Sequence, residues 1–257
     1  MSSGAEAPAV SKPLGFSTTR WSLIISGSQV ESDARAAQKA LAELCHTYWR
    51  PIFSFVCRRG HSPEEAQDLT QDFFAMMIRE NWLKHADRSR GRFRSLLLKS
   101  LQRFLQDERD KARAQRRGGH LQFVAWDDWM AESPSQLRVS ANTVDKLAPE
   151  QLFDFRWAAT VVEQALRNLS DECEAKGRRR LFEVLSPHLA AHQPETCYAS
   201  LARTLGIGEG TVTRQLYNLR LRYRWLLRRE VSKTVSDLTQ VEEEIRYLCA
   251  ALAAGSE

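Results

Sequence analysis

Cysteine is scarce and scattered in this chain. The 257 residues include five cysteines, an odd number, and none of them belongs to a Cys-x-x-Cys pair. A disulfide framework or a zinc site needs paired or closely spaced cysteines, so we predict neither. Cys45-His46, His61 and His85 also lack the spacing of metal ligands. We therefore expect no metal and no cofactor.

Long apolar runs are missing as well. The chain has no run of about eighteen apolar residues, and residues 1–8 lack the basic-then-apolar pattern of a secretory signal. We expect a cytoplasmic protein with no membrane partner. The hydrophobic content of 43% is enough for folded domains with cores of their own.

Common catalytic motifs are absent. The sequence contains no G-x-x-x-x-G-K-[ST] loop, no G-x-S-x-G elbow, no H-E-x-x-H helix and no G-x-G-x-x-G turn. Clustered carboxylates or a nucleophile–base pair are not apparent either. These absences argue against a nucleic-acid-processing enzyme, and we expect the chain not to be an enzyme.

The alternation typical of β-strands is also lacking, and apolar residues recur at helical spacing instead. This pattern predicts an all-α fold with two helical domains, a flexible linker between them and a C-terminal helical extension. The expected boundaries are a disordered start at 1–15, a first domain at 16–117, a linker at 118–150, a second domain at 151–230 and the extension at 231–257.

The first domain contains a clear helix start. Ser62-Pro63-Glu64-Glu65 places a serine cap before a proline and a glutamate three residues after the cap, which predicts a helix over 63–79. Pro51 should kink or break the preceding helix, expected over 34–59. The polar flank of the 63–79 helix is either a protein-binding surface or a solvated face, and consists of Glu64, Asp68, Gln71 and Asp72.

Positive charge is concentrated in two segments. Residues 88–117 hold eleven Lys or Arg against three acids, and residues 210–229 hold six arginines and no acid. The first segment is expected to form a basic loop and then a helix over 92–117, with Phe93, Leu97, Leu101 and Phe104 facing inward. Two basic surfaces on one chain suit contact with a polyanion at two places.

Residues 198–229 have the pattern of a helix-turn-helix. Leu201 and Leu205 lie one turn apart, Ala202 is small where two helices must approach, and Gly206 suits the end of the first helix. The apolar face of the second helix consists of Val212, Leu216, Leu219 and Tyr223.

The opposite face of that second helix carries polar and basic side chains. Thr211, Arg214, Gln215 and Asn218 can hydrogen-bond base edges in a major groove. The arginines that suit phosphates are Arg220, Arg222, Arg224, Arg228 and Arg229. An ordinary helical hairpin with a solvated basic face is the alternative interpretation.

The combination and order of these segments resemble bacterial RNA polymerase sigma factors of the extracytoplasmic-function (ECF) type, in the sigma-70 family. Residues 65–74 look like the acidic D-L-x-Q-[ED]-x-F segment with which that family docks on the polymerase core. Residues 93–117 are similar to the helix that opens the melted promoter element, with Leu96 and Arg103 where the family often carries Trp and Asn. The resemblance covers roughly residues 35–117 and 155–230.

The resemblance implies a promoter-specificity subunit with the polymerase core and promoter DNA as partners. It leaves room for an anti-sigma factor or another regulator. The implied core-binding residues are Asp68, Gln71 and Asp72. The implied contacts to melted DNA are Arg88, Arg90, Arg92, Lys99, Arg103, Gln106 and Arg109. The implied helix-turn-helix contacts are Thr211, Arg214, Gln215, Asn218, Arg220 and Arg222.

Two questions stay open in the sequence. A stand-alone helix-turn-helix regulator that binds duplex DNA without polymerase is the alternative function. The last segment, 230–254, predicts one acidic amphipathic helix, which closes a domain, folds back on the reading helix or binds a partner; domain closure is favoured. Its expected apolar stripe is Val235, Leu238, Val241, Ile245 and Leu248.

Overall fold

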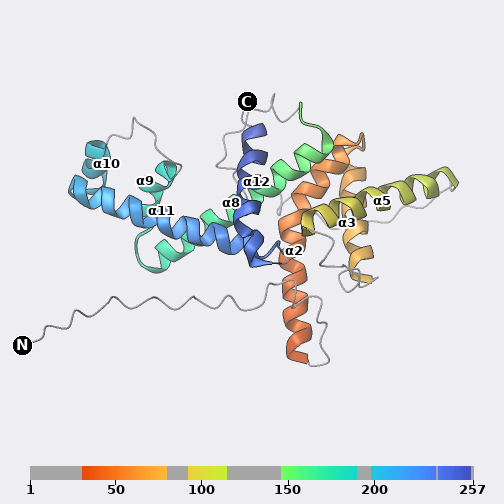
Figure 1. Ribbon diagram of the computed structural model, residues 1–257, viewed down its shortest axis with the longest axis horizontal. Coiled ribbons are helices and arrows are strands. Elements are labelled where there is room, and N and C mark those ends of the chain that lie inside the picture. Colours follow the sequence, from red (N-terminus) through yellow and green to blue (C-terminus); the bar gives the residue numbers. More distant parts are fainter. Residues whose placement is uncertain (1–30, 80–91, 115–145, 190–197, 236, 256–257) are drawn as a thin grey trace, which may run out of the picture.

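The computed structural model describes residues 31–79, 92–114, 146–189, 198–235 and 237–255, and every regular element within these ranges is helical (Figure 1). The expected all-α class is confirmed. The helices are α2 Glu31–Arg58, α3 Pro63–Arg79, α5 Phe93–Ala114, α8 Pro149–Ala175, α9 Arg179–Leu185, α10 Tyr198–Leu205, α11 Glu209–Ser232 and α12 Val241–Ala254, with short 3-10 turns η2 Ser186–His188 and η3 Leu238–Gln240.

Helix α2 continues through Pro51, so the expected break does not occur. A proline inside a helix leaves the carbonyl four residues earlier, here that of Thr47, without its usual donor. Burial on both sides of the proline opposes this cost, because Tyr48 and Ile52 are fully buried in the core and Pro51 is itself buried. Packing therefore outweighs the lost hydrogen bond.

The capping box of α3 is confirmed. The backbone N–H of Glu65 donates to Ser62 Oγ at 3.2 Å, and the backbone N–H of Ser62 donates to Glu65 Oε2 at 3.2 Å. These reciprocal bonds satisfy donors that the first helical turn cannot pair internally. The helix is described as far as Arg79, and the residues after this predicted end lie outside the described ranges.

The inward face of α5 is also confirmed, since Phe93, Leu97, Leu101 and Phe104 are all buried. They lie in one apolar cluster with residues of α2 and α3, including Phe73, whose ring centroid is 5.5 Å from that of Phe104. The predicted end of this helix near residue 117 lies outside the described residues.

Helix α8 connects the two predicted domains. Its first half lies in the cluster formed by α2, α3 and α5, where Phe153 and Trp157 are fully buried. Its second half, with Leu169 and Cys173, lies in a second cluster formed with α9, α10 and α11. One continuous helix therefore contributes to both cores, and it packs against α2 (Figure 1). The boundary predicted at residue 150 falls at the start of this helix.

The segment 230–254 does not form one helix. Helix α11 extends to Ser232, and α12 begins only at Val241. Between them, Asp237 accepts a hydrogen bond from the backbone N–H of Thr239 at 2.9 Å, a local bond that competes with helix continuation. Leu238, expected on the apolar stripe, is 42% exposed. The other four stripe residues are confirmed, because Val235, Val241 and Leu248 are buried and Ile245 is partly buried in the same cluster. Helix α12 packs against α8 and α11.

Candidate nucleic-acid and protein interfaces

Helices α10 and α11 meet at a sharp turn. Gly206 has a positive φ of 68°, a conformation that glycine adopts without a steric penalty. The backbone N–H of Ile207 then donates to the carbonyl of Ala202 at 3.1 Å, which closes the end of α10. Ala202, Val212 and Leu216 are buried between the two helices. The apolar pattern of the sequence thus produces two helices joined by a tight turn.

The outer face of α11 exposes the side chains predicted to contact bases. Arg214 and Asn218 are exposed, and Thr211 and Gln215 are partly exposed. Among the described residues, the Arg214 guanidinium has no intramolecular partner. The first half of α11 therefore presents polar groups to the solvent.

Two apolar residues on the same face were missed by the sequence reasoning. Tyr217 is 60% exposed and Leu221 is 46% exposed. They follow Arg214 and Asn218 by three residues each, so the same helical spacing that identified the polar residues would have placed them here. Exposed apolar groups beside donors can meet the methyl group of thymine in a major groove.

Two of the five arginines predicted to suit phosphates, Arg220 and Arg222, have partners inside the protein. Arg222 binds Glu172 of α8 with both Nε and Nη2, at 2.7 and 2.6 Å, and lies over the ring of Trp225. Arg220 donates to the carbonyl of His188 at 2.8 Å. The hydrogen bond from Arg222 lowers the pKa of Glu172. In this arrangement both guanidinium groups brace α11 against neighbouring elements.

A row of polar and basic side chains runs along α5. Lys99, Arg103 and Gln106 are exposed at spacings of four and three, so they share one face. Gln106 donates to Asp110 at 3.2 Å, and Arg109 is exposed near the carbonyl of Arg59. Arg88 and Arg90, predicted to contact melted DNA, lie outside the described residues.

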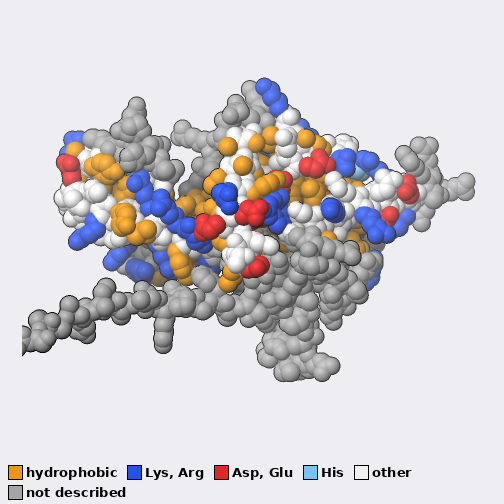
Figure 2. All heavy atoms as spheres, viewed as in Figure 1, with side chains coloured by type: hydrophobic (Ala, Val, Ile, Leu, Met, Phe, Trp, Pro, Cys, Tyr) orange, Lys and Arg blue, Asp and Glu red, His pale blue; other side chains and the backbone are white. Residues whose placement is uncertain are grey.

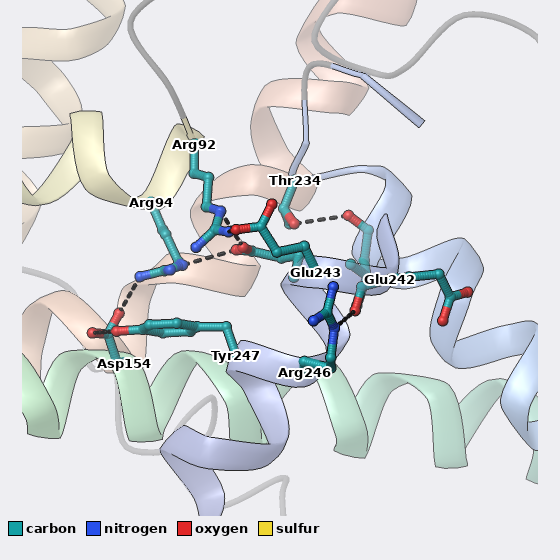
Figure 3. A network of polar contacts seen from close by, with 10 residues as sticks. Arg92, Arg94, Asp154, Thr234, Glu242, Glu243, Arg246 and Tyr247 are labelled. Atoms are coloured by element: carbon teal, nitrogen blue, oxygen red, sulfur yellow. Dashed lines mark hydrogen bonds and ion pairs between the residues drawn. The ribbon is translucent and has the colours of Figure 1, made fainter. Parts of the chain in front are cut away.

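Arg92, also predicted to contact melted DNA, does not share the exposed face of Lys99, Arg103 and Gln106 but pairs with α12. Its Nη2 lies 2.5 Å from Glu243 Oε1, and its Nε lies 2.8 Å from Glu244 Oε2, both in α12 (Figure 3). The neighbouring Arg94 is buried and pairs with Glu244 and with Asp154 of α8, each at 2.8 Å. Sequence reasoning missed this network because the paired residues lie between 60 and 151 positions apart, with no local pattern to link them.

Tyr247 completes the network. Its hydroxyl donates to Asp154 Oδ2 at 2.5 Å, and its ring lies 3.6 Å from the Arg94 guanidinium carbon. Burial acts to lower the pKa of Arg94, but the carboxylates of Glu244 and Asp154 outweigh it and raise that pKa. Burial, followed by the hydrogen bond to Asp154, raises the pKa of Tyr247. The network is therefore ionised at arginine and protonated at tyrosine at neutral pH.

The candidate protein-binding face lies on α3. Asp68 and Asp72 are exposed one turn apart, whereas Gln71 is half-buried, with its Nε2 buried and unbonded within the described structure. Partial desolvation, followed by repulsion from Glu108 and Asp68, raises the pKa of Asp72. Ile78, 52% exposed, adds an apolar group near the end of the same helix.

These candidate faces lie on three different helices, α3, α5 and α11. Figure 2 shows Lys and Arg side chains over α11 and near α5, with acidic and basic side chains interleaved around α12 between them. Comparison with protein-family models, curated proteins and solved structures finds no match. Of the helices described, none has both the length and the apolar character needed to cross a bilayer.

Chemically, the described surfaces are suited to binding. Exposed guanidinium, ammonium and amide groups on α5 and α11 can contact phosphates and base edges. Exposed carboxylates on α3 can contact a basic partner. Within the described ranges, no group of three or more His, Cys, Asp or Glu could hold a metal ion.

Proposed function

We propose that this chain is a sigma factor of the ECF type, which directs bacterial RNA polymerase core to specific promoters in the cytoplasm. The observation that carries the proposal is the placement of exposed acidic side chains on α3 and of exposed basic side chains on two other helices, α5 and α11. A promoter-specificity subunit must bind protein and DNA at the same time, so it needs separate surfaces of opposite charge. The chain itself catalyses no reaction in this proposal.

In this proposal each face binds a different partner. Asp68, Gln71 and Asp72 bind the core, and the α5 face with Lys99, Arg103 and Gln106 contacts the melted promoter element. The outer face of α11 reads duplex DNA further upstream. In this division residues 16–117 form the core-binding domain, residues 151–230 the helix-turn-helix domain, and 231–257 an extension.

The proposal is tested by reconstitution. Purified chain is added to polymerase core on a template library, and specific initiation is expected. Replacing Asp68 and Asp72 with Arg should weaken core binding at least tenfold, which is on the order of 1.4 kcal/mol or more. The reason is that positive charge replaces the acids presented to a basic partner. Affinity is measured by fluorescence anisotropy of the labelled chain.

A matched control carries Asp171→Arg and Glu174→Arg, which make the same charge change on exposed positions of α8. Control and wild type should bind core equally. A wild-type chain that does not associate with core would overturn the proposal. Tight duplex binding without core would point to the stand-alone regulator instead.

A further inference from the structure

The first turn of α12 brings three consecutive glutamates, here called the acidic turn (Glu242, Glu243 and Glu244), against arginines of two distant elements. Arg92, at the start of α5, pairs with Glu243 and Glu244. Arg228, near the end of α11, pairs with Glu242 through Nε at 2.6 Å and Nη2 at 3.2 Å. One short turn therefore pairs with basic residues from both basic segments of the chain.

Burial separates the three glutamates into two kinds. The side chain of Glu244 is fully buried and bridges Arg92 and Arg94, so it anchors α12 to α5. The side chains of Glu242 and Glu243 are 62% and 61% exposed. Exposed ion pairs are weak and open to competition from other anions, whereas a buried and paired carboxylate is costly to displace.

The exposed pairs have the chemistry of a phosphate contact. A guanidinium binds a carboxylate and a phosphate with the same fork of N–H donors. Arg228 presents this fork to both oxygens of Glu242. The hydrogen bond from Arg228 also lowers the pKa of Glu242, so this carboxylate stays charged at neutral pH.

We propose that Glu242 and Glu243 act as an intramolecular mimic of DNA phosphates. In the free chain they occupy Arg228 and Arg92 and weaken its binding to DNA. DNA phosphates displace them, while Glu244 keeps α12 docked. This inference rests on the DNA-binding part of the proposed function and adds a regulatory element to the same surfaces.

The test measures binding of the full chain, without polymerase, to a fluorescein-labelled duplex of mixed sequence. The double variant Glu242→Gln and Glu243→Gln keeps side-chain size and removes the competing charge. We expect about three- to thirty-fold tighter binding at low salt, the range set by releasing two exposed ion pairs. Circular dichroism checks that the variant keeps its helix content.

A matched control separates this effect from a general gain in positive charge. Glu174→Gln and Glu183→Gln make the same charge change and also release an arginine, Arg179, from two exposed pairs. The gain in DNA affinity of the acidic-turn variant should be severalfold larger than that of this control. In an Arg228→Gln background, the gain from Glu242→Gln alone should disappear, because its partner is gone.

Three results would overturn the inference. The first is equal affinity of the acidic-turn and control variants, the second is a gain that persists without Arg228, and the third is no DNA binding by any variant. The sigma assignment is judged separately by association with core. If the acidic-turn variant binds DNA more tightly but the chain never binds polymerase core, the phosphate-mimic proposal stands and the sigma-factor proposal fails.

Discussion

Arginines in this chain have different roles that depend on their partners. Arg214 is exposed on α11, whereas Arg222, two turns further along, is held by both oxygens of Glu172. Arg94 is buried among two carboxylates and a tyrosine ring. Arg214 is therefore a predicted DNA contact, Arg222 a surface ion-pair partner of α8 and Arg94 a buried ion-pair partner of two carboxylates.

Exchanging Arg214 and Arg222 for alanine should separate two of these roles. Arg214→Ala should cost about 1–3 kcal/mol of binding to a cognate duplex if the side chain pairs with a base edge, and leave folding stability unchanged. Arg222→Ala should lower the free energy of unfolding by about 0.5–1 kcal/mol, allowing for solvent screening of a partly exposed pair. Anisotropy and urea denaturation measure the two quantities. Wild-type DNA affinity in Arg214→Ala would contradict the base-reading role.

Local signals in the sequence set the start of α3 and the end of α10. The serine cap and the glutamate three residues later start α3, and Gly206 ends α10 through a positive φ. By contrast, Pro51 is a local signal that tertiary packing overrides, since Tyr48 and Ile52 are buried on either side of it. Caps act within a few residues, but packing in the core determines whether a helix continues through an internal proline.

Removing the cap of α3 should have a measurable cost. Ser62→Ala deletes the oxygen that accepts the backbone N–H of Glu65, so the free energy of unfolding should fall by about 1 kcal/mol. Ser200→Ala, on an exposed position inside α10, removes a hydroxyl without a cap and should leave stability equal or slightly higher. Thermal and chemical unfolding compare the pair. A smaller loss for Ser62→Ala than for Ser200→Ala would contradict the capping role.

Across the whole molecule, α8 joins the two apolar clusters. Phe153 and Trp157 lie in one cluster, and Leu169 lies in the other. Helix α12 packs at the same end of α8 as the first cluster, because Leu248 lies in that cluster and Gly255 lies against the ring of Phe155 in α8. The two helical regions are therefore coupled through shared packing.

This coupling should make unfolding a single event. Leu169→Ala leaves a cavity in the second cluster and should cost about 2–5 kcal/mol. Because α8 is continuous, amide protection in α2 should fall by a similar amount, although α2 does not contact Leu169 in that cluster. Hydrogen exchange of α2 and α11 measures both effects. Unchanged protection in α2 would show that the regions unfold independently.

Local spacing along the chain was enough to predict the all-helical class, the start of α3, the buried face of α5 and the turn between α10 and α11. These features depend on residues within a few positions of each other, so helical periodicity and capping specify them. The pairing of Arg92 and Arg94 with α12, the bracing of Arg222 by Glu172 and the passage of α8 through both cores depend on residues brought together only by folding. Arginine can pair with any carboxylate that burial brings within reach, so its partner is decided by tertiary packing.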